Sequence, residues 1–256
     1  MIIVMRLAVS SYAVSLVLSF SNQYIPAITT SLSSDVRTTT LSPQVLYSKG
    51  IAELSNGDFQ IALDDFTTAI ALAEKSSYGA DRMSDLHVSR GIAFEKLERW
   101  DDAINEYTIS NNIFKKANFL SKDDPVSISN IANTYAGKLQ WEEALKGFTY
   151  AAQLNPKYLA PAIGRALVLY QLDRKEEALS YFTQLVQTYP EYADGLAALA
   201  VMYNERGRTD EAAEAWEEAM QLDSRYIDID WVRSVRRWPP QLVNDLITFR
   251  NKIKQS

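Results

Sequence analysis

The feature that most constrains the fold is a stripe of small and aromatic residues that recurs five times along the chain. Its clearest copy lies within residues 139–156, where Trp141, Ala144, Phe148 and Ala151 stand at offsets of 0, 3, 7 and 10. Because an α-helix has 3.6 residues per turn, this spacing puts the four side chains on one face. Small residues allow a neighbouring helix to approach closely, and aromatic rings fill the space beside it. A single helix cannot bury such a face, so the pattern predicts packing against further copies of itself.

The other copies follow in register. Their aligned alanines are separated by 41, 41, 34 and 34 residues, and a second small residue stands twelve positions before each alanine. The alanines are Ala62, Ala103, Ala144, Ala178 and Ala212, and the earlier small residues are Gly50, Gly91, Ala132, Ala166 and Ala200. This arrangement predicts five pairs of helices whose small residues face each other, joined by short turns such as residues 55–57 and 206–208.

A small and aromatic ladder at a 34-residue period resembles the tetratricopeptide repeat family. The resemblance covers residues 43–224 and implies an all-α fold, a right-handed superhelix of five helix-turn-helix repeats closed by a C-terminal capping helix. Ser42 before Pro43 predicts the start of the first helix, because serine caps helices and proline suits their first turn. The seven extra residues in each of the first two units predict longer second helices there.

The first 40 residues are expected to lie outside the fold. Residues 1–20 carry one positive charge, Arg6, followed by mostly apolar residues, which is typical of a cleavable signal peptide; an uncleaved membrane anchor is the alternative. Residues 21–42 are rich in serine and threonine and contain one acidic residue, Asp35. Together these stretches resemble plastid leaders that pass through the secretory route. We therefore expect residues 1–40 to be a signal or plastid-targeting leader that is removed.

Residues 225–256 are expected to form a basic linker and the capping helix. They carry seven Lys or Arg against three Asp, whereas the whole chain has a net charge of −6. Pro240 predicts the first turn of the helix, whose apolar stripe consists of Leu242, Leu246, Phe249 and Ile253. The preceding D-W-V-R-S-V-R-R-W-P-P segment, with the repeats, resembles tetratricopeptide repeat proteins of cyanobacteria and plastids. That narrower resemblance implies a plastid protein associated with thylakoids.

Few residues suggest catalysis or cofactor binding. The chain has no cysteine and one histidine, His87, which we expect to be packed or half-exposed. Paired acids fall at the starts or exposed faces of predicted second helices, where they complement the helix dipole, at residues 64–65, 101–102, 142–143 and 176–177. We therefore predict no catalytic residue, no cofactor and no metal site. The acidic body of the chain also disfavours nucleic-acid binding.

The resemblance implies that the first helices line a concave groove that binds a peptide or helix. The candidate groove residues are Tyr47, Ile51, Val88, Ile92, Asn130, Asn133, Ile163, Leu167, Tyr170, Val201 and Asn204. Such a mainly apolar surface with a few amides suits an extended or helical peptide, although we expect about half of these residues to pack between units instead. Tyr47 and Ile51 stand where co-chaperones of this family carry Lys and Asn, so a chaperone C-terminal carboxylate is not an expected ligand.

The sequence thus predicts a non-catalytic protein–protein interaction scaffold whose protein partners it does not identify. The narrower resemblance implies assembly or maintenance of a thylakoid membrane complex. A secreted or endomembrane adaptor is the alternative, and an enzyme is a third class. The basic C-terminal segment could also contact acidic partners or the surface of an anionic membrane.

Overall fold

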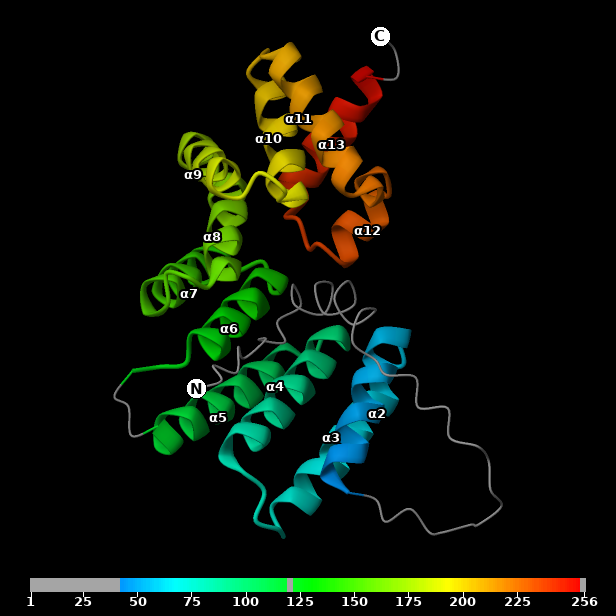
Figure 1. Cartoon of the computed structure of the whole chain (residues 1–256), viewed down its shortest axis with the longest axis vertical. Coiled ribbons are helices and arrows are strands. Elements are labelled where there is room, and N and C mark those ends of the chain that lie inside the picture. The colour runs from blue at the N-terminus through cyan, green and yellow to red at the C-terminus, as the bar shows by residue number, and fades with distance from the viewer. Residues whose placement is uncertain (1–41, 119–121, 254–256) are drawn as a thin grey trace. The chain divides into compact units, whose positions relative to one another are not determined.

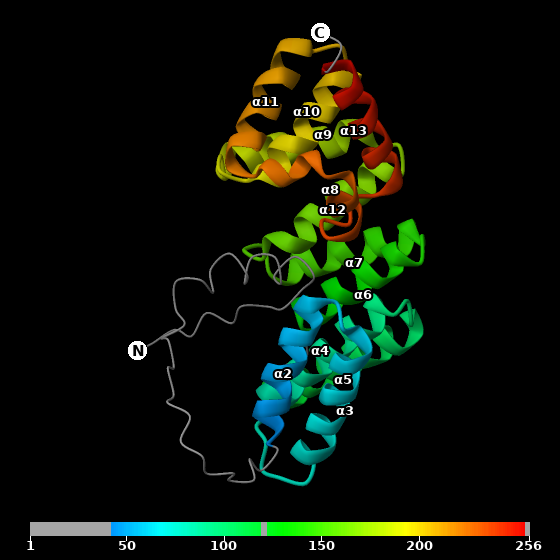
Figure 2. The same ribbon diagram turned by 90° about the vertical axis from the view of Figure 1, so that its right-hand side faces the viewer.

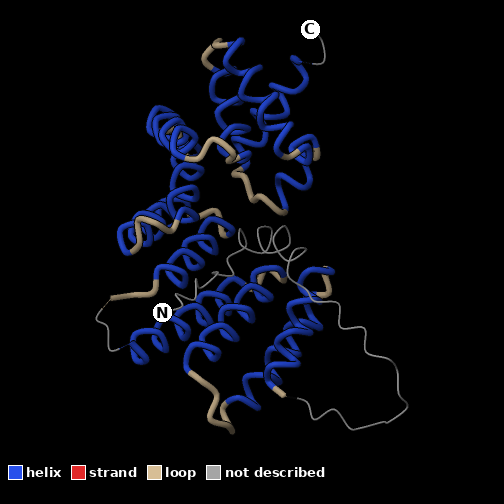
Figure 3. Tube along the Cα trace, in the orientation of Figure 1, coloured by secondary structure: helices blue, strands red, loops and turns tan. Residues whose placement is uncertain are grey.

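The computed structural model describes residues 42–118 and 122–253 (Figure 1). Within these ranges it contains twelve α-helices, one short 3-10 helix and no strand (Figure 3), which confirms the predicted all-α class. The chain divides into two compact units, Met1–Lys138 and Leu139–Ser256, and each is considered by itself. The predicted leader, residues 1–40, lies outside the described residues.

Unit 1 contains the first two helix pairs and one further helix. In chain order these are α2 (Pro43–Asn56), α3 (Phe59–Ala73), α4 (Ala80–Lys96), α5 (Trp100–Asn118) and α6 (Pro125–Gly137). Helix α2 packs against α3, α4 against α5, and α6 against α5. Helix α6 is the first helix of the third predicted pair, whose second helix belongs to unit 2.

Unit 2 contains the rest of the repeat region and the C-terminal segment. In chain order its elements are α7 (Trp141–Leu154), α8 (Leu159–Gln171), α9 (Lys175–Thr188), α10 (Ala193–Glu205), α11 (Thr209–Leu222), the 3-10 helix η2 (Ser224–Ile227), α12 (Ile229–Ser234) and α13 (Pro240–Ile253). Helices α8 and α9 pair, as do α10 and α11, while η2 packs against α11.

The helix starts follow the capping chemistry of the sequence. The Ser42 hydroxyl accepts a hydrogen bond from the Val45 amide at 3.3 Å, which satisfies one amide that the first turn of α2 leaves free. Asp124 does the same for α6, accepting from the amides of Val126 and Ser127. Proline follows each cap, so the prediction from Ser42 and Pro43 is confirmed.

The turns inside the five predicted pairs share one backbone conformation. Each contains a residue with positive φ, between 57° and 89°, five positions before the aligned alanine of the same pair; these residues are Gly57, Glu98, Leu139, Asp173 and Gly207. In four of the turns the next amide donates to a carbonyl five residues earlier, as in the 2.9 Å bond from Arg99 to Phe94. This is the Schellman ending of a helix, which favours glycine at the positive-φ position.

Replacing Leu139 with glycine is expected to stabilise the protein by about 0.5–1 kcal/mol. Leu139 has φ 60° and is 62% exposed, so its side chain adds a backbone penalty and little burial. A left-handed backbone costs a non-glycine residue about 1–2 kcal/mol. Glycine avoids this cost, but its greater freedom in the unfolded chain stabilises that state and offsets part of the gain. Urea unfolding measures the difference. Asn56→Gly, one position before the positive-φ residue of the first turn, is the control and should destabilise.

The two small residues that begin the ladder lie beneath aromatic rings of the second helices. A Cβ atom on Gly50 would stand 2.7 Å from the ring of Phe66, and one on Gly91 would stand 2.6 Å from the ring of Tyr107. Both rings are fully buried. The sequence predicted small residues facing one another across each pair; in these two pairs the nearest neighbour of the glycine is a ring, which explains why no side chain larger than hydrogen fits.

The extra residues of the first and second repeats lie in different kinds of structure. Helix α5 has 19 residues, which confirms the expected lengthening, but α3 has 15 and is close to the 14 of α7, α9 and α11. In the first repeat the additional residues instead form the connection after Ala73 and an earlier start of α4, which has 17 residues. Gly79 ends that connection in an extended conformation, so the helix is not continued through it.

Candidate protein-binding surface

The candidate groove residues of unit 1 are mostly buried. Tyr47 and Ile51 on α2 are half-buried and pack against the core, with the Tyr47 ring 6.1 Å from the ring of Phe66. Burial raises the pKa of Tyr47, which keeps its hydroxyl protonated. The other candidates in this unit, Val88, Ile92, Asn130 and Asn133, are at most 8% exposed.

Two polar groups on α6 are buried without a hydrogen bond. Within the described part of the chain, neither Nδ2 of Asn130 nor Oγ of Ser129 has a partner, although both residues are at most 2% exposed. An unsatisfied buried polar group costs about 1–3 kcal/mol. These two atoms are among several buried side-chain atoms of unit 1 that lack a hydrogen-bond partner in the described residues, Ser89 Oγ being another.

The unit 2 candidates lie on α8 and α10. Ile163, Leu167, Tyr170 and Val201 are at most 5% exposed, and Asn204 is half-exposed. Two of the five, Tyr170 and Asn204, contact the C-terminal helix α13. The structure therefore brings part of the predicted binding surface against a helix of the same chain.

Helix α13 lies across α8 and α10 and is held by polar contacts at its start, middle and end (Figure 2). The Gln241 amide donates to Oε1 of Gln171 at 3.0 Å, and the Tyr170 hydroxyl lies 2.7 Å from Oδ2 of Asp245. At the other end, Nζ of Lys252 donates to Oδ1 of Asn204 at 3.1 Å. All the α8 and α10 residues in these contacts lie in the last turns of their helices.

An apolar stripe lies between these polar contacts. Leu242, Val243, Leu246 and Phe249 are at most 3% exposed, and the Phe249 ring meets Trp216 of α11 edge-on at 5.6 Å. Ile253, the last residue of α13, was predicted to belong to the same stripe but is 39% exposed. Burying each such side chain contributes roughly 1.5–3 kcal/mol, so this stripe supplies most of the attraction that holds α13.

The Tyr170 hydroxyl stands between two carboxylates. It lies 2.9 Å from Oε2 of Glu205 as well as 2.7 Å from Asp245, and Glu205 also pairs with Lys175. Burial and the two carboxylates raise the pKa of Tyr170, so the phenol keeps its proton. Burial opposes ionisation of Glu205, but hydrogen bonds from Lys175 and Tyr170 outweigh it and lower the pKa of Glu205. A phenol has one proton to donate, so it satisfies one of the two acceptors at a time.

The segment before α13 is fixed by a buried cluster that we call the Asp194 clasp: Asp194, Tyr226, Arg236 and Trp238. The Asp194 carboxylate accepts from the Tyr226 hydroxyl, from both Nε and Nη2 of Arg236, and from Nε1 of Trp238 at 3.0 Å. Burial alone would lower the pKa of Arg236, but the charge of Asp194 outweighs it and the net shift is upward. Sequence reasoning noted the D-W-V-R-S-V-R-R-W-P-P segment, which contains Arg236 and Trp238, but missed Asp194, because nothing in the sequence joins Asp194 to a segment about forty residues away.

His87 belongs to a second buried cluster, in unit 1. Its Nδ1 lies 2.8 Å from Oε2 of Glu106, whose other oxygen accepts from Nη2 of Arg90 at 2.8 Å. His87 and Glu106 are 7% and 4% exposed, which confirms a packed histidine. The three side chains join α4 to α5 by hydrogen bonds, while Nε of Arg90 has no hydrogen-bond partner among the described residues.

Replacing Glu106 with glutamine is expected to cost about 1.5–3 kcal/mol near neutral pH, since it weakens charged hydrogen bonds. Burial raises the pKa of Glu106, but the hydrogen bonds from His87 and Arg90 outweigh it, so the net shift is downward. A folded pKa below the unfolded value of about 4.3 gives stability that is present above that pH and lost as the pH falls through the folded pKa. Urea unfolding from about pH 6 to pH 3 should show the gap between the two proteins closing. A gap independent of pH would contradict this role of the carboxylate.

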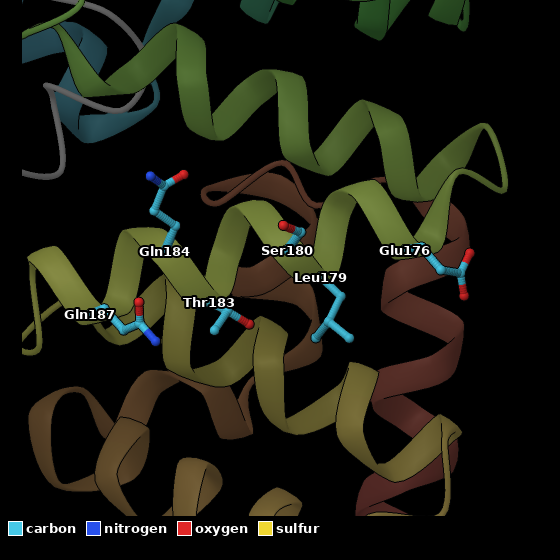
Figure 4. Close-up of a pocket in the computed structure, with 6 residues that line it drawn as sticks. All are labelled: Glu176, Leu179, Ser180, Thr183, Gln184 and Gln187. Atoms are coloured by element: carbon cyan, nitrogen blue, oxygen red, sulfur yellow. The ribbon is translucent and has the colours of Figure 1, made fainter.

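Three of the predicted acidic pairs lie at helix starts, and one shallow hollow lies along a single helix. The pairs at 101–102, 142–143 and 176–177 lie in the first turns of α5, α7 and α9, as predicted. Among the described residues, no group of three His, Cys, Asp or Glu side chains is arranged to hold a metal ion. A shallow hollow lies along α9 and is lined by that helix alone (Figure 4), through Glu176, Leu179, Ser180, Thr183, Gln184 and Gln187.

Paired helices in register, with recurring turns and a small and aromatic ladder, define a helical-repeat protein. The model of the tetratricopeptide repeat family matches residues 47–108 and 163–226, so these two stretches are tetratricopeptide repeats. In these stretches the prediction of such repeats is confirmed. A comparison with curated protein sequences gave no match.

A solved repeat structure supports the fold, and two others are given with it for comparison. A protein with nearly identical TPR-like repeats from Podosopora anserina is 16% identical, with a TM-score of 0.56, and the match covers 71% of this chain and 94% of that one. YrrB, described as a TPR protein with an unusual peptide-binding site, is 15% identical with a TM-score of 0.47 over 71% of this chain and 87% of its own. MamA is 15% identical with a TM-score of 0.48 over 70% and 96%.

Proposed function

We propose that the chain is a non-catalytic scaffold that binds other proteins on the surface formed by the first helix of each helix pair. The observation that carries this proposal is α13, an amphipathic helix that lies on α8 and α10 and is held by an apolar stripe and three polar contacts. A surface that holds one helix in this way has the chemistry to hold others. The tetratricopeptide repeats support the same function, since stacked repeats of this kind create extended binding surfaces.

The particular role that we propose is assembly or maintenance of a thylakoid membrane complex. Its support is the leader-like composition of residues 1–42 and the resemblance of the segment around Trp238 to plastid and cyanobacterial proteins. A secreted or endomembrane adaptor is the second candidate, supported by the same apolar leader. Along the described ranges, no helix combines the length and hydropathy needed to cross a membrane.

A fusion of residues 1–45 to a fluorescent protein separates the two locations. Fluorescence in plastids is the expected result, because an apolar stretch followed by a hydroxyl-rich one matches leaders of the secretory plastid route. Fluorescence in the endoplasmic reticulum or the medium would favour the adaptor instead. The same fusion without residues 1–20 is the control and should stay in the cytosol.

Capture from isolated thylakoid membranes, followed by mass spectrometry, tests the scaffold itself. The full chain should recover a defined set of membrane-complex proteins, and Tyr47→Ala with Ile51→Ala should lower that recovery at least about fivefold, as loss of a binding hot spot does. Ser48→Ala with Ser55→Ala changes exposed residues of the same helix and should leave recovery unchanged. Circular dichroism verifies that both variants are folded. Equal recovery with all three proteins would exclude α2 from the binding surface.

A further inference from the structure

We propose that the face formed by α8 and α10 is a receptor for an amphipathic helix, that α13 is its resident occupant, and that a helix of a partner protein displaces α13. This rests on the proposed scaffold function and specifies the class of partner. The receptor face is the set of α8 and α10 groups that α13 contacts by hydrogen bonds: Tyr170, Gln171 and Asn204. Trp216 of the neighbouring helix α11 packs against Phe249.

The segment before α13 is anchored without it. The Asp194 clasp holds the chain as far as Trp238, and η2 packs against α11, so this segment has contacts with the last repeat that do not involve α13. Only Pro239 separates Trp238 from α13. Helix α13 can therefore leave the receptor face while the clasp stays closed. The same anchor keeps α13 close to that face, so a partner competes against a high local concentration of α13.

One contact between α13 and the receptor face is electrostatically unfavourable. Asp245 and Glu205 meet at the single proton of Tyr170, and Lys175 offsets the charge of Glu205. Two carboxylates that share one donor repel each other, whereas an amide in place of Asp245 could donate to Glu205. A helix with a neutral polar residue at this point should therefore bind better than α13 does.

These contacts define the chemistry of the partner. Leu242, Leu246 and Phe249 show that the face accepts large apolar residues at positions i, i+4 and i+7 of a helix. Asp245 marks position i+3, where we infer an amide or hydroxyl in the partner, and Lys252 marks position i+10. A base at i+10 reaches Asn204 at the C-terminal end of α10, where the helix dipole also favours positive charge.

The test uses a labelled peptide of residues 240–253 and variants of the full chain. Leu242→Asp with Leu246→Asp undocks α13 by placing charges in its apolar stripe and leaves the receptor face unchanged. Asn244→Asp with Thr248→Asp adds the same charges on the exposed side of α13 and is the matched control. Fluorescence anisotropy should show one peptide bound per undocked chain, with at least tenfold weaker binding to the control and to the unmodified chain, because α13 still competes there.

Peptide variants test the contacts one by one. The Leu246→Asp peptide should not bind, the Lys252→Ala peptide should bind more weakly, and the Asp245→Asn peptide should bind more tightly than the natural sequence. An undocked chain that is folded by circular dichroism but does not bind the natural peptide would overturn the proposal. Loss of the helical signal of the repeats in that variant would also overturn it, since α13 would then be part of the core.

Hydrogen exchange on the unmodified chain gives a test that needs no variant. Amides of α13 should exchange faster than those of α8 and α10, because a displaceable helix opens without unfolding its receptor. Equally slow exchange of all three helices would overturn the proposal. Failure of the scaffold function is recognised separately: a chain that recovers membrane proteins equally with α13 docked or undocked keeps that function and loses only this inference.

Discussion

Replacing Asp194 with alanine is expected to destabilise unit 2 by about 3–5 kcal/mol. The carboxylate is 3% exposed and accepts from Tyr226, Arg236 and Trp238. Without it the guanidinium of Arg236, itself 8% exposed, is left buried with no countercharge from this carboxylate, and breaking such a pair from one side is costly. Urea unfolding followed by tryptophan fluorescence should detect the loss, since Trp231 and Trp238 lie in this region.

Two further variants show whether the cost comes from removing the carboxylate that faces Arg236. Asp210→Asn removes an exposed acid in the first turn of α11 and should change stability by less than about 0.5 kcal/mol. Arg236→Met combined with Asp194→Ala removes both charges and should be less destabilising than Asp194→Ala alone. If the double variant lost the sum of the two single costs, the charges would not be coupled and this explanation of the clasp would fail.

Replacing Phe66 with alanine is expected to destabilise unit 1 by about 3–5 kcal/mol. The ring is fully buried and fills the space above Gly50, so its removal leaves a cavity between α2 and α3 that neither backbone can close. The loss should be seen in the unfolding transition of unit 1, monitored by circular dichroism.

Ile61 provides the control for Phe66 on the same helix. It is 49% exposed, and Ile61→Ala should change stability by less than about 0.5 kcal/mol. Gly50→Ala tests the same contact from the other side, because its Cβ would clash with the ring unless the helices move apart; a cost of about 1–3 kcal/mol is expected. A tolerated Gly50→Ala would show that the two helices are not held as closely as the ladder requires.

The sequence was most informative where structure depends on neighbours along the chain. The small and aromatic ladder placed the helices of each pair, Ser42 with Pro43 located a helix start, and the spacing of the alanines recurs in the positive-φ turn residues. The length of α3 was predicted wrongly because extra residues can enter either a helix or a connection. Periodicity does not distinguish these two outcomes when the added residues are polar.

The candidate binding surface stays a prediction from the sequence. Positions along the first helix of each pair indicated which residues share a face. Eight of the eleven candidates, Val88 and Leu167 among them, are buried in the structure. Their role in peptide binding stays a prediction. Tyr170 and Asn204 contact a helix as proposed for this face, yet that helix is α13.

By itself, the sequence determined an all-α chain of repeated helix pairs, because helix periodicity, capping and small-to-large packing are local properties that recur at a constant spacing. Only the tertiary structure decided that Asp194 closes the C-terminal segment and that α13 occupies the face of α8 and α10. Both depend on contacts between side chains that are tens of residues apart in the chain. The helix pattern of each element is compatible with many different long-range contacts. Burial of Leu242, Leu246 and Phe249 together with the hydrogen bonds of Asp194 selects one of them.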